Sequence, residues 1–173
     1  MNTAEKIEKL GVLPIIRLEK VENARKLAAA FKRAGMPLAE VVFRTKDADK
    51  VISGMKEAFP EMTLGAGTIL TSAQVERAQV AGAEFILSPG TDTEIIDCCN
   101  AHHLLPIPGC ATATDVQMSV KHGANLVKFF PAGVYGGLSA MKALSGPFGG
   151  IKFIPTGGVN TQNIGEFIAA PFI

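Results

Sequence analysis

Lys128 is the residue in this sequence whose surroundings most suggest covalent chemistry. It is the one charge in the apolar run 126–130, which is typical of a short buried strand and is ended by Pro131. An ammonium group withdrawn from water loses its solvation, which disfavours the charged form. A desolvated, partly neutral lysine can attack a carbonyl carbon and form a Schiff base. The alternative is a strand-end lysine that buries its methylenes while its amine reaches solvent, and position alone does not exclude it.

Other polar residues stand where further apolar strands end, and parallel α/β folds gather their reactive groups at the carboxyl ends of strands. The strand ends carry Arg17, Glu40, Arg44, Thr68, Ser88, Pro89, Pro108, Gly109 and Lys128. Arginines bind carboxylates and phosphates, so a lysine among them points to an anionic carbonyl substrate. Glu40 could instead simply pair with Arg44, because strand alternation places both on one face. Arg17 could be an ordinary charge at the rim.

Two glycine-containing turns belong to the same set. Thr156-Gly157-Gly158 follows the apolar strand 152–155 and precedes a predicted helix. Free backbone N–H groups at such a turn can bind phosphate, although a plain strand-to-helix connection has the same appearance. The second turn, Gly65-Ala66-Gly67-Thr68, is weaker evidence for a binding site, since a pair of glycines can mark only a tight turn.

The elements that would position these residues repeat with a regular strand–turn–helix pattern. The predicted strands cover residues 12–17, 39–44, 62–67, 84–88, 104–108, 126–131 and 152–155. Predicted helices follow at 21–34, 47–59, 71–82, 91–101, 112–123 and 160–169, after a short amphipathic leader. Strands that alternate with helices of this length pair in parallel, because a parallel neighbour requires a crossover connection.

Two parallel architectures fit this pattern, an open doubly wound sheet and a closed (β/α)₈ barrel. No G-x-G-x-x-G follows the first strand, which weakens the doubly wound dinucleotide-binding alternative. The units are also uniform in length, which favours the barrel. Only seven strands are found in residues 1–173, so we expect a single TIM-barrel domain that lacks its eighth strand and the helix after it.

The charge balance and the lack of long apolar stretches limit the kinds of partner that the protein can have. Seventeen basic and sixteen acidic residues nearly balance, so neither nucleic acid nor an anionic membrane is expected as the main partner. The first ten residues lack the apolar core of a signal peptide, and no apolar stretch approaches the length of a membrane span. A cytoplasmic protein is therefore expected.

Cysteine and histidine are also placed close together near residue 100. Cys98 and Cys99 are adjacent and cannot form an unstrained disulfide, while Cys110 is distant. His102 and His103 follow them, but neither a zinc spacing nor a second ligand cluster is apparent in the sequence. We therefore expect no metal and no cofactor, and interpret this segment as a helix end with polar tips.

Five segments together carry a family resemblance. They are Glu40-Val41-Val42-Phe43-Arg44-Thr45, Gly65-Ala66-Gly67-Thr68, Ser88-Pro89-Gly90, Val127-Lys128-Phe129-Phe130-Pro131-Ala132 and Pro155-Thr156-Gly157-Gly158-Val159. In order and approximate spacing, the sequence resembles the aldolases of 2-dehydro-3-deoxy-6-phosphogluconate (KDPG) and 4-hydroxy-2-oxoglutarate (KHG) from about residue 11 to 169. The lysine and glutamate strands together make the resemblance specific.

The resemblance implies a metal-independent class I aldolase, a lyase on a TIM barrel, usually a homotrimer, that acts on a 2-keto acid. Lys128 would be the Schiff-base lysine and Glu40 the general acid and base. Pyruvate binding would involve Arg44, Thr68, Pro89 and Phe130. Thr156, Gly157 and Gly158 would line the phosphate site, with Arg17 as a further candidate. The family pattern continues through an eighth strand that completes the phosphate site.

Two other functions remain compatible with the residues. One is another phosphate-binding barrel, an isomerase or decarboxylase in which Lys128 serves only as a charge. The other is a non-catalytic barrel or fragment that binds sugar acids. Imine trapping distinguishes the aldolase from the isomerase or decarboxylase, because only a Schiff-base enzyme is reduced irreversibly onto its substrate. The non-catalytic alternative predicts that Lys128→Ala keeps ligand binding and that no enzyme concentration gives turnover.

Overall fold

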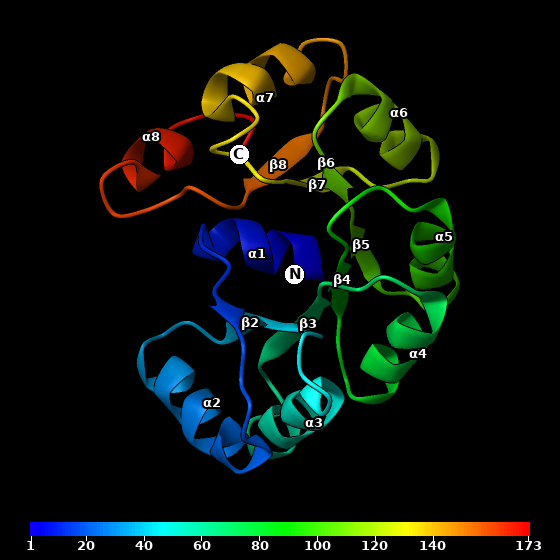
Figure 1. Cartoon of the computed structure of the whole chain (residues 1–173). Coiled ribbons are helices and arrows are strands. Elements are labelled where there is room, and N and C mark those ends of the chain that lie inside the picture. Colours follow the sequence, from blue (N-terminus) through cyan, green and yellow to red (C-terminus); the bar gives the residue numbers. More distant parts are fainter.

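In the computed structural model, which describes residues 1–173, parallel strands form a curved ring with helices on its outside (Figure 1). The strands are β1 (Ile15–Ile16), β2 (Leu38–Val42), β3 (Thr63–Gly67), β4 (Phe85–Leu87), β5 (Leu105–Ile107), β6 (Gly109–Cys110), β7 (Leu126–Phe129) and β8 (Lys152–Pro155). Every strand pair is parallel, which confirms the predicted α/β class.

The strands pair in chain order, as a barrel requires. One sheet runs β1-β2-β3-β4-β5 and the other β6-β7-β8. The second sheet begins where the predicted strand 104–108 continues past Pro108, so β5 and β6 are two segments of one barrel position. β1 pairs only with β2 and β8 only with β7, so the ring of strands is open between β8 and β1.

Helices cover the outer face of the ring. They are α2 (Ala24–Arg33), α3 (Ala48–Ala58), α4 (Ser72–Val80), α5 (Thr93–Ala101), α6 (Ala113–Lys121), α7 (Gly137–Ser145) and α8 (Ile164–Ile168), and a 3-10 turn, η1 (Val21–Asn23), precedes α2. The first helix, α1 (Thr3–Leu10), instead packs against the interior of the ring. No helix is both long enough and apolar enough to cross a bilayer.

The starts of the central helices follow from their capping residues. The Thr71 side chain accepts a hydrogen bond from the N–H of Gln74, and Asp92 accepts from Glu94 and Ile95. Thr112 forms a reciprocal capping box with Asp115. These caps satisfy N–H groups that a helix terminus leaves without a partner, which fixes where α4, α5 and α6 begin.

Two helices differ from the sequence-based expectation. The sequence predicts no helix between the sixth and seventh strands, but the structure has α7 there. Gly136 and Gly137 adopt positive φ in the turn at the start of this helix. The helix predicted at 160–169 is shorter. Asn160 and Asn163 bond locally to the backbone in a turn, and α8 begins only after them.

Side chains alternate between the inside and the outside of the ring. On β2, Ala39 and Val41 pack against the outer helices in a large apolar cluster, whereas Leu38 lies in a smaller interior cluster with Phe85, Leu87 and Ile107. Helix α1 adds Ile7 to this interior cluster, and Figure 1 shows α1 over the middle of the ring. The interior is therefore filled with apolar side chains at the level of Leu38, below the polar residues described next.

Candidate active site

Lys128 and Glu40 meet inside the barrel, one layer above the apolar interior. Val127 and Phe129 pack outward with the helices, so alternation turns Lys128 inward on β7, just as it turns Glu40 inward on β2. Lys128 is 4% exposed and Glu40 1% exposed. The Lys128 Nζ lies 3.6 Å from Glu40 Oε1. The Lys128 side chain is therefore almost entirely withdrawn from water, which favours the desolvated lysine over a strand-end lysine whose amine extends into solvent.

The structure also decides between the two partners considered for Glu40. The Arg44 Nε donates a hydrogen bond to Thr68 Oγ1 at 3.0 Å, and Arg44 forms no ion pair with Glu40. The buried charge partner of Glu40 is Lys128, which comes from the far part of the sequence. A lysine and a carboxylate held this close inside a barrel form a proton donor and acceptor pair.

The Glu40 carboxyl is electrostatically unusual. Burial raises its pKa above the ordinary value, and the positive charges of Lys128 and Arg44 oppose that rise without cancelling it. Its Oε1 atom has no hydrogen-bond partner in the protein. A raised pKa and an oxygen without a partner suit a carboxyl that accepts and returns a proton during a reaction.

This pKa predicts a pH effect. If ionised Glu40 acts as the base, activity falls as the pH drops through its pKa, so the raised pKa moves the acid limb of kcat/KM above the ordinary glutamate range. We expect this limb in a pH–rate profile of the wild type and its loss in Glu40→Gln. An acid limb at the usual glutamate pKa, or one that persists in Glu40→Gln, would contradict the assignment.

Gly67 provides the space that the Glu40 carboxylate occupies. A Cβ atom built on Gly67 would lie 1.8 Å from Glu40 Oε1, much closer than any real contact. Gly67 is the last residue of β3, and the register sets Glu40 opposite Gly65 on the neighbouring strand. The glycine thus fixes where the carboxylate can lie relative to Lys128.

Substituting Gly67 with alanine is expected to displace the Glu40 carboxylate and lower kcat by roughly 10- to 100-fold, since misplacement by about 1 Å can have this effect. Steady-state kinetics with a melting curve measures it. Gly165→Ala is the matched control, because a Cβ there meets nothing within 4 Å. Equal kcat in Gly67→Ala and Gly165→Ala would show that this contact does not position Glu40.

Three further predicted residues lie around the pair. Thr68 adopts a positive φ of 58°, which directs its hydroxyl to Arg44. Arg44 is exposed, and its charge is felt at Glu40. The Lys128 Nζ lies 5.4 Å from the centroid of the Phe130 ring. The Phe130 ring therefore lies beside the reactive amine, and the Arg44–Thr68 pair lies close enough to Glu40 for the arginine charge to act on it.

Pro89 reaches the site through its backbone. A Cβ atom on Gly109 would lie 2.2 Å from the Pro89 carbonyl oxygen, so only glycine permits this approach. Gly109 is in turn the β6 residue opposite Lys128 in the register. The Ser88-Pro89-Gly90 turn is thereby held next to the lysine strand. The sequence identifies Gly109 only as a strand-end residue, because a close approach between distant segments leaves no local signal in it.

The Thr156-Gly157-Gly158 turn is attached to the end of the lysine strand. The N–H groups of Ala132 and Gly133 donate to the carbonyl oxygens of Thr156 and Gly157, each at 2.8 Å. Gly157 and Gly158 have positive φ, and a Cβ on Gly158 would lie 3.0 Å from the Cα of Gly133. Their own N–H groups donate no hydrogen bond within the protein. They remain available to an anion.

Arg17 is not brought into contact with these residues. It follows β1 at the carboxyl end of the strand, but its side chain is exposed and pairs with Glu19 at 2.9 Å. Its placement at the phosphate site stays a prediction.

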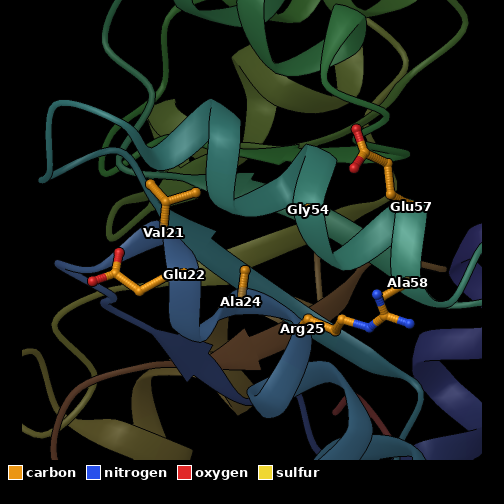
Figure 2. A pocket seen from close by; sticks show the side chains of 7 residues that line it. All are labelled: Val21, Glu22, Ala24, Arg25, Gly54, Glu57 and Ala58. Carbon is orange, nitrogen blue, oxygen red and sulfur yellow. The ribbon is translucent and has the colours of Figure 1, made fainter.

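A surface hollow of about 400 Å³ is a different feature. Its lining comes from η1, α2 and α3 and includes Glu22, Arg25 and Glu57 (Figure 2). These elements belong to the outer helical layer, whereas Lys128 and Glu40 lie inside the ring of strands. The hollow is therefore separate from the candidate active site.

Comparison with known proteins agrees with the geometry. The sequence model "KDPG and KHG aldolase" matches residues 3–173. A 2-dehydro-3-deoxy-phosphogluconate aldolase of Treponema pallidum is 40% identical over 167 residues, which are 96% of this chain and 80% of the relative.

Two solved structures extend the comparison. The 2-keto-3-deoxy-6-phosphogluconate aldolase of Zymomonas mobilis ZM4, solved with 3-phosphoglycerate, superposes with a TM-score of 0.92 at 34% identity, covering 99% of this chain and 82% of the other. The KDPG aldolase of Legionella pneumophila, with pyruvate captured as a covalent carbinolamine intermediate, gives a TM-score of 0.89 at 36% identity, covering 94% and 79%. The predicted TIM-barrel fold is confirmed, and this chain belongs to the KDPG and KHG aldolase family.

Proposed function

We propose that this protein is a class I aldolase that cleaves KDPG to pyruvate and glyceraldehyde 3-phosphate, KHG to pyruvate and glyoxylate, or both. The observation that carries the proposal is the buried Lys128 Nζ, 3.6 Å from a buried carboxylate inside the barrel. The covalent carbinolamine in the Legionella relative supports an imine mechanism.

The first half of the reaction joins the substrate to Lys128. The amine, after passing a proton to Glu40, attacks the C2 carbonyl carbon and forms a carbinolamine. Glu40 returns the proton to the departing hydroxyl, which leaves as water, and a protonated imine remains. Because Glu40 has a raised pKa, it can carry this proton in both directions.

The second half breaks the C3–C4 bond. A base removes the proton of the C4 hydroxyl, the aldehyde departs, and the C3–C4 electron pair moves into the protonated imine to give an enamine. We propose that Glu40 is the base that accepts this proton, either directly or through a water. Protonation at C3 restores the imine, and hydrolysis releases pyruvate and the free lysine.

Binding groups are assigned by the same geometry. Arg44 and Thr68 would hold the pyruvate carboxylate, with Pro89 and Phe130 beside the imine. The free N–H groups of Gly157 and Gly158, next to the lysine strand, would bind the phosphate of KDPG, with Thr156 beside them. KHG has no phosphate. No metal or cofactor is assigned a role, and we propose a homotrimer in the cytoplasm.

Substrate choice is tested by measuring pyruvate release from KDPG and from KHG in parallel. If the Gly157–Gly158 turn binds phosphate, inorganic phosphate should compete with KDPG more strongly than with KHG. Sedimentation of the same preparation tests the trimer. Absence of pyruvate release from both substrates would contradict the proposed activity.

A further inference from the structure

Three side chains of different ligand types converge on the outside of the barrel, away from Lys128. They are Glu76 on α4, Cys98 on α5 and His102 at the end of α5. One ligand atom from each, a carboxylate oxygen, the Sγ and a ring nitrogen, lie within 4.8 Å of one another. Glu76 is exposed, whereas Cys98 and His102 are half-buried, so the group is open to solvent from one side.

The packing of α4 against α5 brings the three side chains together. Cys98 and His102 are four residues apart and therefore lie on one face of α5, on successive turns. Helices α4 and α5 are neighbours on the outer layer (Figure 1), which brings Glu76 to the same face. The Cys98 thiol contacts the carbonyl oxygen of Ser72, the first residue of α4, at 4.0 Å. The site is thus built across two helices.

The three ligand groups are not otherwise engaged. The Glu76 carboxylate and the His102 ring form no hydrogen bond or ion pair within the protein, and Cys98 makes only the long contact with Ser72. The neighbouring Cys99 is fully buried in the large apolar cluster and is not part of the group. His103 does not belong to the group.

We propose that Glu76, Cys98 and His102 bind one zinc ion, with water as a fourth ligand. Thiolate, imidazole and carboxylate are the ligands that zinc takes, at roughly 2.0 to 2.3 Å in a tetrahedron. That geometry requires ligand atoms roughly 3.5 Å apart, which modest side-chain rotation supplies from the observed spacing. Binding releases the thiol proton to solvent and links α4 to α5.

This inference is independent of the proposed aldol chemistry. The site lies on the helical layer, and the aldol step needs only Lys128 and Glu40. Zinc should therefore stabilise the folded chain without being required for turnover, since a ligand that binds only the native state raises stability by mass action.

The test is titration of the chelator-treated full chain with zinc in a calorimeter, repeated with Co²⁺ to detect a thiolate-to-metal charge-transfer band. We expect one ion per chain, the cobalt–thiolate band, and a rise in Tm with added zinc. Cys98→Ser should abolish the cobalt–thiolate band. Both Cys98→Ser and His102→Asn should weaken zinc binding by roughly 100-fold or more, because the loss of a residue that only hydrogen-bonds to a metal ligand already weakens metal binding by up to about 100-fold. Glu76→Gln should weaken it by roughly 10-fold or more.

His103→Asn is the matched control, because His103 neighbours His102 and asparagine tolerates its positive φ of 56°. It should bind zinc as the wild type does. Melting of each variant without metal shows whether the chain is folded. Absence of stoichiometric zinc binding by the wild type, or equal binding by folded Cys98→Ser and His103→Asn, would overturn the proposal.

Discussion

Replacing Lys128 with methionine is expected to lower kcat/KM for pyruvate release by about 10⁴-fold or more, because the nucleophile that forms the imine is lost. Methionine is similar in length and apolar, so it can fill a position that is only 4% exposed. The measurement is a steady-state assay at high enzyme concentration, with circular dichroism to establish that the variant is folded.

The control for the loss of turnover in Lys128→Met is a variant that removes a lysine far from the site. Lys121→Met removes an exposed lysine from the end of α6 and should leave turnover unchanged. A folded Lys128→Met enzyme that retains more than a small fraction of wild-type turnover would show that Lys128 serves only as a charge. The isomerase or decarboxylase alternative would then be favoured.

Glu40→Gln is expected to separate imine formation from bond cleavage. Glutamine has the shape of glutamate and fits the space above Gly67, but it cannot accept the C4 hydroxyl proton. We expect pyruvate imine to remain detectable while aldol cleavage falls by about 10²-fold or more, as for loss of a general base. Single-turnover kinetics measures both steps in one preparation.

Glu57→Gln supplies the comparison for this variant. Glu57 is exposed and lies at the hollow between α2 and α3, on the outer layer (Figure 2). Its replacement should change neither step. If Glu40→Gln cleaves substrate as fast as Glu57→Gln does, another group carries the proton and Glu40 has no part in the mechanism.

The strand pattern was predictable from sequence because the barrel strands are short apolar runs, and α4, α5 and α6 begin at recognisable capping residues. Lys128 and Glu40 could be selected because a charge inside such a run is costly unless it is used. Their mutual pairing could not be derived from local sequence. Alternation equally permitted Glu40 to pair with Arg44, and only the curvature of the ring brings β2 and β7 face to face.

Close approaches between distant segments were the other feature hidden in the sequence. Gly67 and Gly109 look like ordinary strand-end glycines, yet each makes room for a group from another strand or turn. Glu76 lies in a different helix from Cys98 and His102, so no local ligand spacing in the sequence joins it to them. Helix α7 was missed because glycines precede it and no polar cap marks its start.

Borohydride reduction in the presence of pyruvate tests the Schiff-base assignment most directly. The protein is reduced with pyruvate, its intact mass is measured, and the modified residue is located by peptide mapping. We expect one pyruvate-derived adduct, located on Lys128 and absent from Lys128→Met. An unmodified protein, or an adduct on a different lysine, would contradict the assignment of Lys128 as the nucleophile and with it the proposed aldolase mechanism.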